Sequence, residues 1–245
     1  MKHLLALLKF VRVLGCILMA YWDIRTKFPK LSDDQQARYV EVWARGMLTV
    51  IGIEVRVKGH PATGPVLMAA NHISWLDILV MHAACHCRFV AKSEIRSWPL
   101  LGALTTGGGS LYIERSSNRD ALRVVHQMAE ALQKGHVLAV FPEGATGDGI
   151  TLLPFHANLL QAAISAEAPI QPIALQFIDA HTHAISLAPC YRDDDTLIGS
   201  LWRTLCAPPL LAQVRYGDKQ TADGRNRREW ALDLQATVGQ LRQSN

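Results

Sequence analysis

A histidine and an aspartate stand five positions apart in the segment Asn71-His72-Ile73-Ser74-Trp75-Leu76-Asp77. The apolar run 66–70 predicts a buried strand, and residues 78–81 resume at helical spacing, so the pair falls on a strand-to-helix turn. Open α/β sheets place their chemistry at such carboxyl ends of strands. An imidazole can take a proton from a hydroxyl, and a carboxylate on its other nitrogen fixes the tautomer. The spacing therefore indicates a general base, His72, that is oriented by Asp77.

The same turn also fits a purely structural interpretation. Ser74 and Asp77 have the spacing of a capping box, in which polar side chains satisfy the free N–H groups at the start of a helix. In that case Asp77 would stabilise the helix and take no part in chemistry. The residues of the turn alone leave both interpretations open.

Two later segments have residues suited to ligand binding. Residues 141–149 follow the apolar run 137–140 and contain three glycines within six positions, with Glu143 at their start. Such glycines allow positive φ or a close approach of the backbone to a ligand. Residues 107–116 read as a glycine-rich turn and a strand with Arg115 at its end, and an arginine can bind a phosphate with two parallel hydrogen bonds. An ordinary turn and a surface ion pair of Arg115 are the alternatives.

Together these segments resemble the 1-acylglycerol-3-phosphate acyltransferase family, the membrane glycerolipid acyltransferases. Four motifs stand in the family's order across roughly residues 65 to 175: Asn71-His72 with Asp77, Gly109 to Arg115, Phe141 to Gly144, and the proline-bearing strand 168–175. Residues 89–92 and 98–102 also look like the segments that lie between the first two motifs. Each motif is weak alone, but the ordered set is specific.

The resemblance implies an α/β fold with a mostly parallel sheet flanked by helices and an N-terminal membrane-associating helical pair. The alternation of patterns agrees with it. We expect strands at residues 53–58, 65–71, 88–92, 110–115, 136–141, 169–177, 183–189 and 212–216. We expect helices at 74–84, 93–104, 118–133, 156–166 and 225–242. The expected division is an N-terminal helical membrane-docking segment, 1–52, and a catalytic domain, 53–245.

The resemblance also implies the reaction, in which a fatty acyl group moves from an acyl thioester to the free hydroxyl of 1-acylglycerol-3-phosphate and gives phosphatidic acid. His72 and Asp77 would be catalytic, and the turn amides after His72 or Gly144 are candidate oxyanion donors. The expected substrate-binding residues are Asn71, Lys92, Arg115, Glu143 and Gly144. No cofactor or metal is expected, and acyl-CoA or acyl carrier protein would be the co-substrate.

One departure from the family leaves the acceptor open. Many members carry Thr-Arg after Phe-Pro-Glu-Gly, and that arginine is thought to help hold the acceptor's phosphate. Here Ala145-Thr146 stands in its place. Some bacterial relatives with a similar loop are linked to lyso-ornithine lipid, so O-acylation of that or another lyso-lipid is the alternative.

The first 30 residues favour a membrane surface over nucleic acid. They hold six basic residues against one acidic residue, whereas the whole chain of 245 residues carries a net charge of only +4 and no other basic stripe. Lys2, Lys9 and Arg12 are spaced for one face of an apolar helix, which suits a helix lying in the interface better than one that spans the membrane. Residues 33–51 predict a second amphipathic helix, capped by Ser32 or Asp33, that either docks with the first or belongs to the core.

The cysteines indicate the cellular location, and the absence of other motifs argues against a metal site, a hydrolase and a lipid-binding module. Five cysteines, an odd number, indicate reduced thiols in a cytosolic setting, and the cytoplasmic face of the bacterial inner membrane is the expected location. His82, Cys85, His86 and Cys87 lack a distant partner pair, so no metal is expected there. A lipid hydrolase would need a Gly-x-Ser-x-Gly elbow, which is absent, because Tyr112 stands where the second glycine should be. A lipid-binding module without catalysis would have no use for His72 and Asp77 at their spacing.

Overall fold

The computed structural model describes residues 2–113, 118–192 and 194–244, apart from the side chains of 92, 113 and 118–121. Within these residues seven strands form one sheet in the order β1-β7-β6-β2-β5-β3-β4. Only β6 and β7 pair antiparallel there, so the predicted mostly parallel α/β sheet is confirmed. The strands are β1 (Ile53–Lys58), β2 (Val66–Ala70), β3 (Arg88–Lys92), β4 (Leu111–Ile113), β5 (Val137–Val140), β6 (Ile170–Asp179) and β7 (Leu210–Tyr216).

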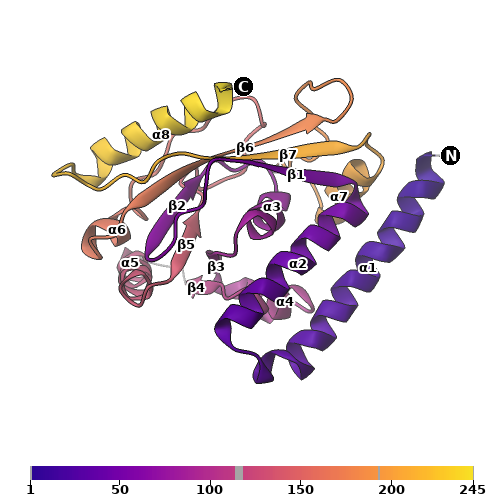
Figure 1. Ribbon diagram of the computed structural model, residues 1–245, viewed down its shortest axis with the longest axis horizontal. Coiled ribbons are helices and arrows are strands. Elements are labelled where there is room, and N and C mark those ends of the chain that lie inside the picture. Colours follow the sequence, from indigo (N-terminus) through magenta and orange to yellow (C-terminus); the bar gives the residue numbers. More distant parts are fainter. Residues whose placement is uncertain (1, 114–117, 193, 245) are drawn as a thin grey trace.

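Helices cover both faces of the sheet (Figure 1). The side chains of β2 alternate between two cores: Met68 and Ala70 join one, and Leu67 and Ala69 join the other. Successive strand residues point to opposite faces, so an entirely apolar strand must be buried on both. The first core is closed by α2 (Asp33–Ile51), α3 (Leu76–Ala84) and α7 (Leu197–Leu205), and the second by α5 (Asn118–Gln133), α6 (Gln161–Ser165) and α8 (Arg227–Gln243).

The first helix, α1 (Lys2–Thr26), lies outside α2 (Figure 1). Ala6, Val13 and Ala20 are its buried apolar residues and recur every seven positions, the spacing of a seam between two packed helices. The indole N–H of Trp43 on α2 donates to the carbonyl of Cys16 on α1 at 3.2 Å. The two helices therefore form the predicted helical pair.

The second helix of that pair also belongs to the core. Of the two predicted caps, Ser32 and Asp33, it is Ser32 that caps α2, with a complete capping box, and Gly52 ends the helix at a φ of 101°. Met47, Leu48 and Ile51 are buried in the same core as β2. The expected boundary after residue 52 thus falls between α2 and β1, but α2 packs on the sheet as a core helix does.

The outer face of α1 is apolar. Among the described residues, α1 and the turn after it (2–30) are the one helical segment long and apolar enough to cross a membrane by length and composition. Its exposed large side chains are Leu4, Leu5, Leu7, Leu8, Val11, Leu14, Leu18, Met19 and Trp22. The expected basic stripe is only partly present, because Lys9 turns inward and its Nζ donates to the Ile51 carbonyl at 2.9 Å.

Three expected elements differ from the structure. The predicted helix 156–166 is shorter, because α6 covers only Gln161–Ser165. The predicted helix 93–104 is divided into η2 (Ser93–Ser97) and α4 (Leu101–Gly107), because Pro99 lies between them and Leu100 has a φ of 60°. The predicted strand 183–189 is wrong. It makes only an isolated bridge between Ile178 and Ile185, and Pro189 has no N–H with which to extend a ladder.

Candidate active site

The histidine and the aspartate of the first motif meet on the turn after β2. The ring Nδ1 of His72 lies 2.8 Å from Oδ2 of Asp77, whose side chain is fully buried. Because a carboxylate only accepts hydrogen bonds, Nδ1 carries the proton and Nε2 presents its lone pair. The side chain of His72 is 18% exposed, so the imidazole can be reached from outside. This geometry is that of a general base with an orienting carboxylate.

Asp77 also bonds to the backbone of the turn. The same Oδ2 accepts the backbone N–H groups of Ile73 at 2.6 Å and Ser74 at 2.9 Å. Ser74 Oγ in turn accepts the N–H of Leu76, at 3.3 Å, at the start of α3. The two interpretations of the turn are therefore compatible, since one carboxylate oxygen accepts the turn's amides and contacts the imidazole; the catalytic role of the pair stays a prediction. Those two amides are occupied, which removes them as oxyanion donors.

Asn71 fixes the turn to the neighbouring strand β6. Its side-chain amide donates to the carbonyl of Leu175 at 3.1 Å and accepts the N–H of Leu175 at 2.7 Å. The residue is 2% exposed. These bonds extend the pairing of β2 with β6 past the end of β2, so Asn71 positions the histidine beside it. Its expected contact with substrate stays a prediction.

Glu143 holds the turn from the opposite side. Oε1 accepts the backbone N–H of His72 at 2.6 Å, and Oε2 accepts the N–H of Leu153 at 2.9 Å. Burial raises the pKa of Glu143, and the bonds from His72 and Leu153 partly oppose that rise. Both oxygens thus serve the site's framework. The expected role of Glu143 in the acceptor pocket stays a prediction.

The loop after β5 also contacts the imidazole itself. The ring of Phe141 stacks on that of His72 with centroids 3.9 Å apart and an interplanar angle of 8°. Gly147 donates its N–H to the carbonyl of His72 at 2.8 Å. Phe141 and Glu143 therefore fix the ring plane and the backbone of His72 from one loop. The register of β2 and β5, with Ala69 opposite Val140, brings the two loops together.

The backbone conformation at position 144 requires a glycine. Its φ is 73°, and a Cβ added there would lie 3.1 Å from Cδ2 of His156. Its own N–H donates to the carbonyl of Phe141 at 3.1 Å. His156, which we did not predict as a neighbour of the site, is held by its N–H to the carbonyl of Pro142 at 2.8 Å. The glycines of residues 141–149 predicted the turn, but no local signal placed His156 beside it.

Of the two cationic residues expected to bind substrate, only Lys92 lies among the described residues. Lys92 ends β3, where it pairs with Ile113 of β4. This is the carboxyl edge of the parallel strands, the same edge on which His72 stands. Arg115 lies outside the described residues. The expected contacts of Lys92 and Arg115 with substrate stay predictions.

The histidine–cysteine segment runs from His82, in the last turn of α3, to the buried Cys87. His82 is 4% exposed, and burial and then the charge of His86 lower its pKa to about 3. The His82 and His86 rings stack with centroids 5.4 Å apart. In the described part of the chain, no group of three or more histidine, cysteine, aspartate or glutamate residues is arranged to hold a metal ion. A reaction without metal or cofactor stays an expectation.

Comparison with known proteins gives the family. The family model described as Acyltransferase matches residues 49–176. A 1-acyl-sn-glycerol-3-phosphate acyltransferase of Neisseria meningitidis serogroup B is 39% identical over 186 residues, which cover 75% of this chain and 72% of the relative. A lyso-ornithine lipid O-acyltransferase of Pseudomonas aeruginosa is 33% identical over 245 residues, which cover 97% of this chain and 93% of the relative.

A solved structure supports the fold. The crystal structure of the 1-acyl-sn-glycerophosphate acyltransferase PlsC from Thermotoga maritima matches with a TM-score of 0.65, 18% identity, and coverage of 97% of this chain and 99% of that chain. The likeness extends across the N-terminal helices and the sheet. With the family model over more than half of its residues and relatives above 30% identity along most of both chains, this protein belongs to the acyltransferase family.

Proposed function

We propose that the protein transfers a fatty acyl group from an acyl thioester to the free hydroxyl of 1-acylglycerol-3-phosphate and so makes phosphatidic acid. The observation that carries this proposal is the His72–Asp77 pair, with Nδ1 and Oδ2 at 2.8 Å. Among the described residues nothing bonds to Nε2 of His72. The 39% identity with the Neisseria meningitidis 1-acyl-sn-glycerol-3-phosphate acyltransferase supports this choice of acceptor.

The proposed reaction needs one base and no enzyme nucleophile, because a thioester is already activated. The acceptor hydroxyl oxygen attacks the thioester carbonyl carbon while its proton moves to Nε2 of His72. The tetrahedral intermediate then collapses, the C–S bond breaks, and the leaving thiolate takes the proton from the imidazolium. Asp77 stabilises the positive imidazolium between the two steps. The products are the ester and the free thiol, and His72 returns to its starting state.

We propose that α1 places this site at a membrane. Nine large apolar side chains of α1 are exposed, a patch that a soluble surface rarely carries. Lyso-lipid acceptors reside in the membrane. Acyl-CoA and acyl carrier protein are water-soluble and would reach the acceptors from the cytoplasmic side. The proposed location is therefore the cytoplasmic face of the bacterial inner membrane.

Lyso-ornithine lipid is the second candidate acceptor, and two observations favour it. The Pseudomonas aeruginosa lyso-ornithine lipid O-acyltransferase matches almost the full length of both chains. Thr146, in the place of the family's arginine, turns away from ligand binding, because its Oγ1 donates to the carbonyl of Tyr191 at 2.6 Å. The hydroxyl chemistry at His72 would be the same for both acceptors.

An acceptor panel tests the proposal. Purified protein in mixed micelles would receive labelled acyl-CoA or acyl-acyl carrier protein with lysophosphatidic acid, lyso-ornithine lipid, lysophosphatidylglycerol or water alone. We expect thioester consumption only with a lipid acceptor, and the highest kcat/KM with lysophosphatidic acid. Efficient acylation of lyso-ornithine lipid with none of lysophosphatidic acid would select the second candidate. Release of free fatty acid without an acceptor would identify a hydrolase.

A further inference from the structure

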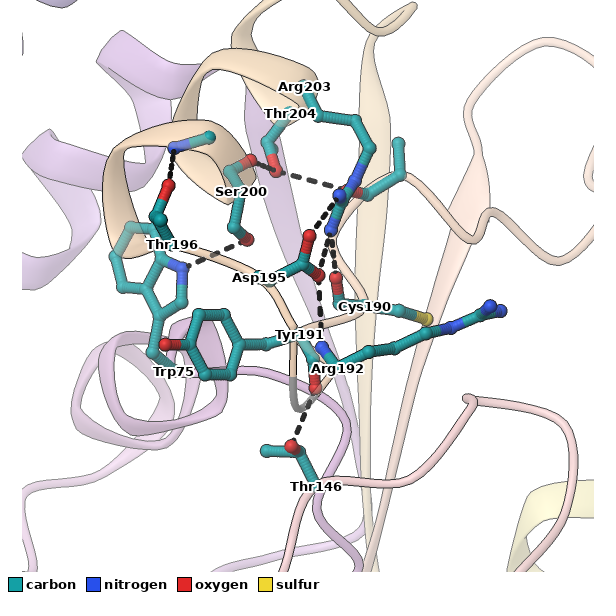
Figure 2. A network of polar contacts seen from close by, with 12 residues as sticks. Trp75, Thr146, Cys190, Tyr191, Arg192, Asp195, Thr196, Ser200, Arg203 and Thr204 are labelled. Carbon is teal, nitrogen blue, oxygen red and sulfur yellow. Dashed lines mark hydrogen bonds and ion pairs between the residues drawn. The ribbon is translucent and has the colours of Figure 1, made fainter.

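The segment before α7 joins the catalytic turn to the glycine loop. Tyr191 donates its N–H to the carbonyl of Ile73 at 3.1 Å, directly after His72. The carbonyl of Tyr191 accepts the hydroxyl of Thr146 at 2.6 Å (Figure 2). Cys190 adds a bond from its Sγ to the carbonyl of Asp148 at 3.2 Å. The residue after Tyr191 therefore stands at the rim where the two motifs meet.

α7 holds this segment in place (Figure 2). Arg203 forms a double ion pair with Asp195, at 2.7 and 2.8 Å. It also donates from Nε to the carbonyl of Ala188 at 3.0 Å and from Nη2 to the carbonyl of Cys190. The backbone of the rim is thus fixed at several points, although its outward side chains are exposed.

Arg192 is the cation that this framework presents. Its backbone N–H donates to Oδ2 of Asp195 at 3.0 Å, and its exposed side chain extends away from Asp195 and Arg203 (Figure 2). Within the described residues its guanidinium has no hydrogen bond and no carboxylate within ion-pair distance. An arginine on a fixed backbone, whose guanidinium bonds to no described residue, is suited to binding an anion in two-pronged geometry.

Two described carboxylates near Arg192 are occupied by other donors. Asp195 is taken by Arg203, and Asp148 accepts the N–H groups of Ile150 and Thr151 at 2.8 and 2.6 Å. Hydrogen bonding, chiefly from Thr151 and Ile150, lowers the pKa of Asp148, and the charge of Arg192 contributes to the shift. The charge of Arg192 therefore acts on a carboxylate of the glycine loop whose hydrogen bonds come from other donors.

The other described arginines at this rim are already engaged. Arg203 is bound to Asp195, and Arg242 donates from Nη2 to the carbonyls of Gly149 at 2.7 Å and Ile150 at 3.0 Å. We infer that Arg192 binds the anionic headgroup of the lyso-lipid acceptor and contributes to acceptor specificity. This inference rests on the proposed function, because it assigns one more residue to the same site.

Steady-state kinetics of three variants test the inference. Arg192→Gln removes the charge, Arg192→Lys keeps it without the forked geometry, and Arg228→Gln removes one exposed charge at the start of α8 as a control. With lysophosphatidic acid we expect Arg192→Gln to raise KM about tenfold or more, as loss of a charged contact should. kcat should change less than about twofold, and Arg192→Lys should recover part of the loss. Tm should be unchanged, because the guanidinium bonds to nothing described.

The outcomes separate this inference from the proposed function. Equal KM values for Arg192→Gln and Arg228→Gln would overturn the role of Arg192, and wild-type activity on lysophosphatidic acid would still support the function. A fall in kcat at constant KM would overturn it too. If the wild type acylates lyso-ornithine lipid instead, the proposed acceptor fails. The same three variants on that acceptor, which carries a carboxylate, would then test Arg192.

Discussion

The backbone N–H of His72 donates to Oε1 of Glu143 at 2.6 Å, so the acidic residue of one motif holds the histidine of another. The second carboxylate oxygen binds Leu153, and Gly147 returns a bond to the carbonyl of His72. The turn that carries His72 and the glycine loop are therefore one hydrogen-bonded unit. A change at Glu143 should act on the position of His72 more than on substrate affinity.

Glu143→Gln tests this unit through the pH dependence of stability. Burial raises the pKa of Glu143 above its ordinary value, so the folded protein binds this proton more tightly than the unfolded chain. The group's contribution to stability is then present below the ordinary carboxyl pKa and is lost as pH rises through the raised value. Glutamine does not ionise. Relative to the wild type, the Tm of Glu143→Gln should therefore increase as pH rises from about 4 to 7.

Glu130→Gln, at an exposed position of α5, is the matched control. Its Tm difference from the wild type should stay nearly constant over the same range. A Glu143→Gln difference that falls with pH would mean that the bonds from His72 and Leu153 outweigh burial and that the pKa is lowered instead.

Asp77→Asn should separate the two roles of that residue. The asparagine oxygen can still accept the N–H groups of Ile73 and Ser74, so the protein should fold. The neutral amide no longer stabilises an imidazolium, and kcat should fall by about 10²–10⁴-fold. Asp77 Oδ1 is buried without a described partner, so an NH₂ group there should cost about 1–3 kcal/mol of stability. Circular dichroism melting and thioester assays measure the two effects. Near-normal kcat with lowered stability would leave Asp77 with the capping role alone.

The turn that carries His72 and Asp77 could be predicted from the sequence, because it depends on residues close together in the chain. An apolar strand, a polar turn and a helical repeat follow each other within 20 residues, and the structure keeps that order. The bonds of Asn71 to Leu175 and of Glu143 to His72 span 104 and 71 positions, and nothing in the local pattern specifies them. They depend on strand order, which puts β2 between β6 and β5.

Lys9 and residues 183–189 also differ from prediction because local patterns do not contain long-range contacts. Lys9 was predicted on a basic outer stripe from helical spacing alone. The structure turns it inward because the last carbonyls of α2 lack intrahelical partners and attract a cation. Residues 183–189 have a strand's composition, but the polar groups of Leu175, which a continuing strand would need, are bonded to Asn71. Long-range pairing overrides local propensity in both cases.

Lys9→Met tests the inward position of this lysine. Loss of its bond to the Ile51 carbonyl should lower stability by about 0.5–1.5 kcal/mol, with little effect on vesicle binding. Arg12→Met is the comparison, because Arg12 is exposed on the same helix. It should leave Tm nearly unchanged and weaken binding to anionic vesicles. Urea melts and vesicle sedimentation at two salt concentrations would measure both. Equal loss of stability in the two variants would contradict the inward position of Lys9 and the exposed position of Arg12.

Substitutions on the outer face of α1 test the membrane role. Leu4, Leu8, Val11 and Leu18 are 65, 56, 60 and 49% exposed, so changing all four to glutamine should spare the seam with α2. We expect loss of vesicle binding with thioester turnover retained on detergent-dispersed acceptor. Deletion of residues 1–30 should also release the protein but would uncover α2. A quadruple variant that still sediments with vesicles at high salt would place the membrane contact elsewhere.

The most direct measurement is acyl transfer by His72→Ala, with Tm and thioester consumption recorded on the same preparation. Glu143 accepts the backbone N–H of residue 72 and Gly147 donates to its carbonyl, and neither bond involves the imidazole, so the variant should fold. Loss of the general base should lower kcat by at least about 10²–10⁴-fold at neutral pH, with KM for the thioester little changed. The reaction assigned to His72 predicts that result. Turnover within a few-fold of the wild type in folded His72→Ala would contradict it.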